Sequence, residues 1–181
     1  SWPVYSGKSF DIWDCDRNTY YAHIDPEIAK SVLNSKRSKP NKRSPFYEMH
    51  EDWRLDPSTL PCLHPRIAFR DAVRSSDRRT TIATLIPPNT TITNKGPYLL
   101  RIRGGVRDEA FLLSIMASIP FDWFSRRYVE LNLNFFILNP LPVPRPQEND
   151  SLRLRAIELA GRLSSQDQRF EKWAKAVGVG C

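Results

Sequence analysis

The sequence lacks the segments that mark membrane and secreted proteins. No apolar run approaches the about 20 residues that a helix needs to cross a bilayer, so the chain is not expected to span a membrane. The first residues, SWPVYSGKSF, have neither the basic start nor the apolar stretch of a secretory signal. The three cysteines are too few and too scattered for a disulfide framework: Cys15, Cys62 and Cys181. We therefore expect a cytoplasmic protein in a reducing compartment.

Patterns of common catalytic sites are also missing. The pair Gly104-Gly105 is isolated, so neither a P-loop nor a dinucleotide-binding loop is present, and no Ser lies in a Gly-x-Ser-x-Gly elbow. The histidines lack HExxH spacing: His23, His50 and His64. A zinc site would have to combine Cys15 and Cys62 with two of these histidines, and their spacings match no common zinc motif. We therefore predict a non-catalytic chain that holds no metal or cofactor.

One short segment is superficially similar to a catalytic motif. Asn139-Pro140-Leu141-Pro142 resembles the Asn-Pro-Pro-aromatic motif of amino-methyltransferases, in which the aromatic residue stacks on a flipped base. Here Leu141 and Pro142 stand where the motif needs proline and an aromatic residue, so no stacking face exists. The segment is not expected to be catalytic.

What the sequence does have is positive charge. It contains 27 Lys and Arg against 20 Asp and Glu, for a net charge of +7, which favours an anionic partner. The segment Ser35–Ser44, SKRSKPNKRS, has five basic residues and no acid, and is expected to be an exposed loop. It could be merely a solvated linker, or its cations could contact phosphates: Lys36, Arg37, Lys39, Lys42 and Arg43.

A second basic region lies in the stretch PRIAFRDAVRSSDRRTTIATLIPP, residues 65–88. Its first half alternates with a period of two, which predicts a strand that has Arg66, Arg70 and Arg74 on one face. Residues 75–77 then form a turn, and residues 80–86 form a second, β-branched strand. The exposed face of this hairpin, continued by Arg78 and Arg79, would present guanidinium groups to phosphates or to guanine. The alternative is a solvated strand with scattered charge.

The remaining segments predict short strands and several helices. Residues 1–24 should form strands, and Asp25 should cap a helix reaching about residue 34. A further strand is expected within residues 91–103, which would present Lys95, Arg101 and Arg103 to phosphates. Asp108 should cap a helix through residue 116, and NLNFFIL, residues 132–138, should be a buried strand.

The later part of the chain is expected to be mainly helical. A helix over residues 121–129 should turn its aromatic residues inward, namely Trp123, Phe124 and Tyr128, and Arg126 could form an ion pair with Asp122 or Glu130. A helix over residues 151–163 should have its leucines near one face, and a last short helix should begin at a Ser165–Gln168 capping box and end at Gly178.

These elements predict an α+β fold, with a twisted, mostly antiparallel sheet packed against C-terminal helices. We expect residues 1–146 to form the core. Residues 147–181 either pack on that core or form a small helical lobe of their own.

Several blocks of the sequence together resemble one family. These are residues 65–88, NKGPYLL at 94–100, and FLLSIMASIPFDWFSRRYVELNLNFFILNPLPVPRP at 111–146. They resemble the C-terminal target-recognition region of adenine-N6 DNA methyltransferases, in type IIG-like restriction-modification proteins and related phage-defence methylases of prokaryotes. VYSGKSFDIWD at 4–14 is similar to the "LYEGKM…FD" opening of that region, with Ser6 and Ser9 as departures. The likeness runs from about residue 2 to residue 177.

The resemblance implies a division of labour. In such proteins an upstream methyltransferase domain binds S-adenosylmethionine, and a nuclease domain is sometimes present. Neither is in this sequence, so this chain is expected to be a fragment of the parent protein, to bind double-stranded DNA, and neither to methylate nor to cut it.

Base readout is expected from Arg70 and Arg74, with the other cations nearby or on phosphates. Because a block shared by proteins that read different sequences could be scaffold, readout could instead lie in residues 34–64. The alternative function is a protein-interaction or subunit-docking module, in which residues 140–146 could act as a polyproline ligand.

Overall fold

Two small sheets form the β part of the fold. The computed structural model describes residues 1–180. In the first sheet, β1 (Trp2–Tyr5) lies between β2 (Ala22–Ile24), which is antiparallel to it, and β5 (Thr91–Ile92), which is parallel. In the second sheet, β3 (Arg66–Phe69) pairs antiparallel with β4 (Ala83–Ile86). The predicted pairing of these two segments is confirmed, although both strands are shorter than expected.

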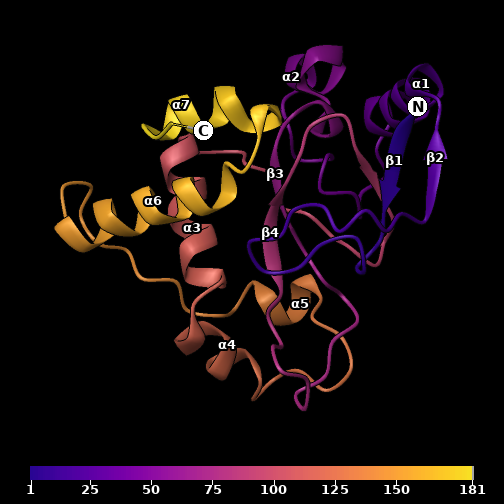
Figure 1. Ribbon diagram of the computed structural model, residues 1–181. Coiled ribbons are helices and arrows are strands. Elements are labelled where there is room, and N and C mark those ends of the chain that lie inside the picture. Colours follow the sequence, from indigo (N-terminus) through magenta and orange to yellow (C-terminus); the bar gives the residue numbers. More distant parts are fainter. Residues whose placement is uncertain (181) are drawn as a thin grey trace.

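Helices surround the sheets on two sides. Figure 1 shows β3 and β4 in the middle of the molecule, with α3, α6 and α7 on one side and α1, β1 and β2 on the other. The helices are α1 (Pro26–Ser38), α2 (Glu51–Leu55), α3 (Val106–Met116), α4 (Ile119–Ser125), α5 (Phe135–Leu138), α6 (Ser151–Ser164) and α7 (Glu171–Val177). The fold class is therefore α+β, with C-terminal helices packed against the sheet, as the sequence predicts. None of the helices within residues 1–180 combines the length and apolar character needed to cross a bilayer.

The principal core joins β3 and β4 to the helices on one side. It contains Ile67 and Phe69 from β3, Leu85 from β4, Leu113 from α3 and Trp173 from α7, all of them buried. Helix α3 packs against both α6 and α7. The C-terminal helices thus complete the same core as the central strands.

Helix α1 begins as predicted but ends later. The Asp25 side chain accepts hydrogen bonds from the backbone N–H groups of Glu27 and Ile28, and Pro26 occupies the first turn. The helix then continues to Ser38 instead of ending near residue 34. The first half of the basic segment is therefore helical, which corrects the prediction of a loop.

Helix α6 does not bury the face on which the sequence groups Leu152, Ala156, Leu159 and Leu163. Its buried residues are Ile157, Ala160, Gly161 and Ser164, whereas the leucines at 159 and 163 are exposed and Leu152 is 79% exposed. The small residues decide this orientation, because a Cβ on Gly161 would lie only 2.9 Å from Val177 Cγ1. The close approach of the C-terminal segment therefore selects the glycine face over the leucine face.

The segment predicted as a buried strand is instead a short helix. Backbone pairing is confined to residues 131–133, where Leu131 O accepts from Val73 N and Leu133 N donates to Asp71 O. The Asn134 side chain then accepts from Ile137 N and starts α5. Phe136 is consequently 88% exposed. The inward orientation predicted for Trp123 and Tyr128 is also wrong, since both are exposed.

Two of three predicted helix-end signals differ in detail. Gly105 is the N-cap of α3, and Asp108 sits three residues later, where its carboxylate accepts from Gly105 N at 2.7 Å. Asp167, and not Ser165, caps the turn that leads into α7. Gly178 ends α7 with a positive φ of 98°, as predicted.

Candidate nucleic-acid interface

The predicted row of exposed arginines does not begin on β3, because all four residues of this strand are buried, Arg66 among them. Arg66 is only 4% exposed. Its Nη1 donates to Pro61 O at 3.2 Å and to His64 O at 3.3 Å, and its Nη2 donates to Thr90 O at 2.9 Å. The guanidinium also lies 4.9 Å from the centre of the Tyr98 ring. Arg66 is therefore a structural residue that closes loops around β3, and it cannot reach DNA.

Replacing Arg66 by methionine is expected to lower the free energy of unfolding by about 2–4 kcal/mol, because three carbonyls would lose a charged donor in a buried site. Urea denaturation of both proteins measures the loss. The matched control is Arg103→Met, an exposed arginine, which should change stability by less than about 0.5 kcal/mol. Unchanged stability in the Arg66 variant, combined with weaker DNA binding, would restore the predicted face.

Arg70, the first predicted base reader, is also held inside the fold. Its Nη2 donates to Phe10 O at 2.5 Å and lies 3.4 Å from Asp11 Oδ2. These contacts tie the end of β3 to the loop after β1. Arg70 thus has a structural partner, and the carboxylate that it contacts is Asp11.

The predicted second strand and α4 are joined by a buried carboxylate. Asp122 Oδ1 accepts from the backbone N–H groups of Thr80 and Thr81, each at 2.7 Å. Asp122 Oδ2 accepts from Arg126 Nε at 3.0 Å, and Arg79 Nε lies 3.5 Å from Oδ1. This Asp122 cluster makes Arg79 structural, and it confirms the ion pair between Arg126 and Asp122.

The connection from β3 to β4 leaves two arginines exposed. Arg126 donates at 2.7 Å to Ser75 O and to Arg78 O, so this connection is fastened to α4. Arg74 and Arg78 are exposed and form no ion pair within residues 1–180. Of the five arginines predicted on the hairpin, these two remain available to a partner.

The basic segment keeps most of its cations on the surface. Lys36, Lys39, Lys42 and Arg43 are exposed and form no ion pair within the described part of the chain; together they are called the basic tract. Arg37 differs, because it is 1% exposed. Its guanidinium donates to Thr59 Oγ1 at 2.7 Å and to Asp56 O at 2.6 Å, and so fastens α1 to the segment after α2.

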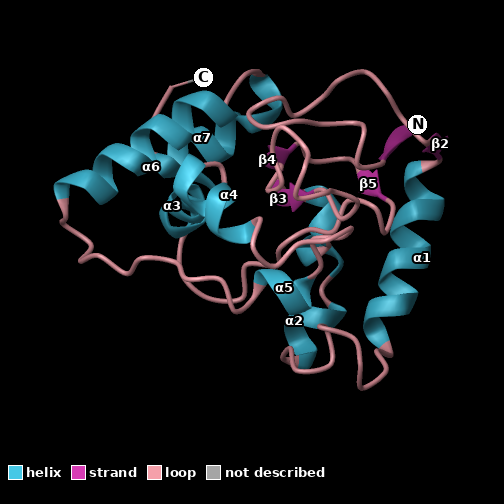
Figure 2. Ribbon diagram, turned by 90° about the horizontal axis from the view of Figure 1, so that it is seen from below, coloured by secondary structure: helices cyan, strands magenta, loops and turns pink. Residues whose placement is uncertain are grey.

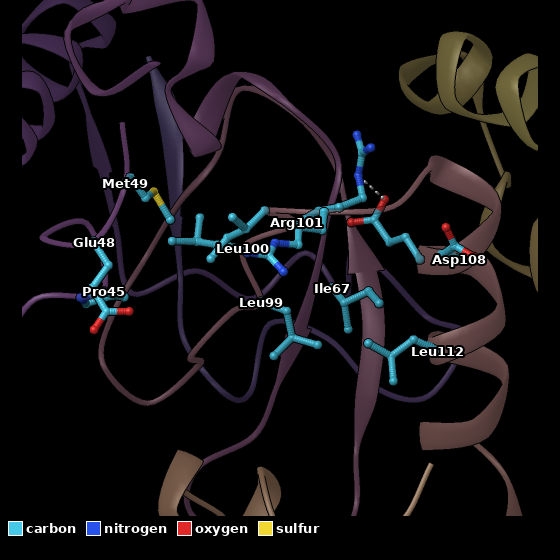
Figure 3. Close-up of a pocket in the computed structure, with 12 residues that line it drawn as sticks. Pro45, Glu48, Met49, Ile67, Leu99, Leu100, Arg101, Asp108 and Leu112 are labelled. Carbon is cyan, nitrogen blue, oxygen red and sulfur yellow. Dashed lines mark ion pairs between the residues drawn. The ribbon is translucent and has the colours of Figure 1, made fainter. Parts of the chain in front are cut away.

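A groove of about 550 Å³ lies beside the basic tract. Figure 3 shows Pro45, Glu48 and Met49 on one side and Leu112 of α3 on the other, with residues 99–101 between them. A smaller cavity of about 140 Å³ is lined by both Lys36 and Phe46, which places the end of α1 next to the segment bordering the groove. Figure 2 shows α1 along the edge of the molecule opposite to α6.

Two of the three cations predicted on a strand within residues 91–103, namely Arg101 and Arg103, line the groove. Arg101 Nε lies 3.9 Å from Glu109 Oε2, and Arg103 is exposed without an ion pair in residues 1–180. Burial raises the pKa of Glu109, opposed by a hydrogen bond from Trp173 and by the charge of Arg101. The third cation, Lys95, pairs with Asp71 at 3.3 Å.

The exposed cations form two separate groups. Arg101 and Arg103 line the groove, and the basic tract leads through Ser44 to Pro45 at its border, with Lys36 beside Phe46 in the smaller cavity. The other group, Arg74 and Arg78, lies beside α4, at the opposite end of the molecule in Figure 1.

Sequence reasoning missed the groove, because its walls come from residues 45–49, 99–103 and α3, and no local pattern links these segments.

No family model matches this chain, and neither a curated protein nor a solved structure is significantly similar to it. Its function is therefore inferred from its own residues and their geometry.

Proposed function

We propose that this chain is the double-stranded DNA recognition module of a restriction-modification or phage-defence adenine-N6 DNA methyltransferase. The observation that carries the proposal is the basic tract, which gathers four unpaired cations within eight residues next to a groove that contains two more. Such a surface suits the closely spaced phosphates of a duplex. The resemblance of the sequence blocks to target-recognition regions supports the same assignment.

The tract and the groove take different roles in this proposal. The tract, with Arg101 and Arg103 of the groove, grips phosphates without regard to sequence, while the exposed Arg74 is the predicted base reader that can still donate to base edges. The methyltransferase domain of the parent protein supplies S-adenosylmethionine and the chemistry. The module works in the cytoplasm and positions DNA for that domain.

Duplex binding by the chain should fall steeply with salt. Six phosphate contacts predict a slope of about −5 for log affinity against log salt, or roughly a 1,000-fold loss between about 50 and 200 mM. Fluorescence anisotropy with a labelled duplex of about 30 base pairs measures this slope. A single-stranded oligonucleotide of the same length is the control, and its slope should be shallower. Absence of binding at about 50 mM salt would reject the proposal.

A second candidate function, docking onto a protein partner, is favoured by one observation. Helices α4 and α5 and the segment between them expose apolar side chains at one end of the molecule: Ile119, Trp123, Tyr128, Leu131 and Phe136. Clusters of this kind are typical of protein contacts. An apolar interface would respond little to salt, so the same titration separates the two functions.

A further inference from the structure

The groove has the shape and lining of a site for a small planar ligand. Its lining is largely apolar, with Met49 at one side, Leu112 at the other, and Ile67, Leu99 and Leu100 between them (Figure 3). Its volume of about 550 Å³ falls within the range of about 300–1,000 Å³ that is typical of small-ligand sites. Apolar walls on two sides suit the faces of a ring.

Polar groups lie at both sides of the groove, with Glu48 on the side away from α3 and Asp108 and Glu109 on α3. Glu109 is 9% exposed and lines both the groove and an adjoining cavity of about 190 Å³. Its Oε2 accepts from Trp173 Nε1 at 2.9 Å, while its Oε1 makes no hydrogen bond within residues 1–180. A carboxylate oxygen in that position can accept from ring or amino N–H groups.

Cations also line the groove. Arg101 Nε is 3.9 Å from Glu109, longer than a normal charge-assisted hydrogen bond, so the guanidinium keeps donors available for another anion. Arg103 also lines the groove, and the basic tract leads directly into Pro45 at its border. A ligand that contains both a ring and a phosphate would find apolar side chains for its ring and cations for its phosphate.

We propose that the groove holds a single nucleotide, with its base against the apolar side chains next to Leu112, its amino edge toward Glu109, and its phosphate on Arg101 and Arg103. The nucleotide is either an extrahelical nucleotide of bound DNA, a case that rests on the proposed function, or a free mononucleotide. Bases with an exocyclic amino group bind better than thymine, which has none to donate to the carboxylate.

Two measurements on the full chain test this inference. In the first, calorimetry follows the binding of free dAMP, dCMP, dGMP and dTMP. In the second, the fluorescence of 2-aminopurine placed opposite an abasic site in a duplex reports on its removal from the base stack, because unstacking this base from its neighbours is inexpensive. The expected result is a several-fold rise in emission on binding, or heat from the amino-bearing mononucleotides.

Variants tie the signal to the groove. Leu112→Tyr narrows it and should weaken nucleotide binding by about tenfold or more. The matched control, Leu152→Tyr, makes the same change at an exposed position of α6 and should have no effect. Glu109→Gln preserves the acceptor for Trp173 and tests the carboxylate if the first variant folds poorly; it should reduce the preference over thymine.

The outcomes separate the two proposals. Emission that rises with the wild type and with Leu152→Tyr, but not with Leu112→Tyr, supports an extrahelical nucleotide. Heat from free nucleotides with the same variant pattern supports a free ligand. Salt-dependent duplex binding with neither signal overturns the groove inference and leaves DNA recognition intact. Absence of duplex binding and of both signals overturns both.

Discussion

Replacing the basic tract by glutamine at Lys36, Lys39, Lys42 and Arg43 is expected to weaken duplex binding by about 100-fold at about 0.1 M salt. Each cation that neutralises a phosphate releases a counterion, so the slope of log affinity against log salt should become shallower by about three to four. Because these side chains are exposed and form no ion pairs within residues 1–180, their removal should leave the fold intact. Fluorescence anisotropy at several salt concentrations measures both quantities.

The matched control removes four exposed cations from the opposite side of the molecule. It carries glutamine at Arg155, Arg162, Lys172 and Lys175, on α6 and α7, and so has the same net charge as the tract variant. A small loss in the control and a large loss in the tract variant place the phosphate contacts on the tract. Equal losses in both would mean that net charge alone drives binding, and that the tract is only a solvated segment.

Replacing Asp122 by alanine is expected to lower the free energy of unfolding by about 3–5 kcal/mol. Two buried backbone N–H groups, at Thr80 and Thr81, would lose their acceptor, and the guanidinium groups of Arg79 and Arg126 would lose their counter-charge. Urea denaturation followed by circular dichroism measures the loss. An unchanged midpoint would show that the Asp122 cluster adds nothing to stability.

Two further variants sharpen this result. Asp122→Asn keeps a side-chain oxygen that can accept from Thr80 and Thr81, so it isolates the contribution of the charge and should cost less than the alanine variant. Glu130→Ala removes an exposed acid from the segment that follows α4, and should change stability by less than about 0.5 kcal/mol. We expect the free energy of unfolding to increase in the order Asp122→Ala, Asp122→Asn, Glu130→Ala.

Local signals in the sequence predicted the elements that depend on local chemistry. The Asp25 cap and Pro26 define the start of α1, and Gly178 ends α7, because these residues act within one helical turn. The pairing of β3 with β4 was also predictable from two apolar runs joined by a polar segment. The helix-end contacts lie within one turn, and β3 and β4 are consecutive strands along the chain.

The arginine face was wrongly predicted because the alternation of polar and apolar residues does not show whether an arginine is exposed to solvent or already hydrogen-bonded within the fold. The acceptors for Arg66 come from residues 61, 64 and 90, and the acceptors for Arg70 come from residues 10 and 11. Such partners are supplied by distant loops, and a period of two shows only that a side chain is polar. The face of α6 was missed for a related reason, since the approach of the chain near Val177 selects Gly161.

The candidate site was predicted in part. Charge alone predicted the exposure of four of the five cations in residues 35–44, whereas the burial of Arg37 depends on Thr59 and Asp56. The groove could not be predicted, because its three walls meet only in the folded chain. Arg79 and Asp122 lie in two of the sequence blocks described above and contact each other, so these blocks contribute to the scaffold.

The anchoring of Arg37 has a consequence for the energetics of association. Its hydrogen bonds hold the end of α1, and Asn41 Oδ1 accepts from Arg43 N at 2.9 Å in the turn that follows, so the backbone that carries the neighbouring lysines is already ordered before any ligand arrives. A polyanion would then bind to a basic tract whose backbone is already ordered, and only the side chains would lose conformational freedom on binding. The entropic cost of capture is accordingly lower than it would be for a flexible polybasic tail.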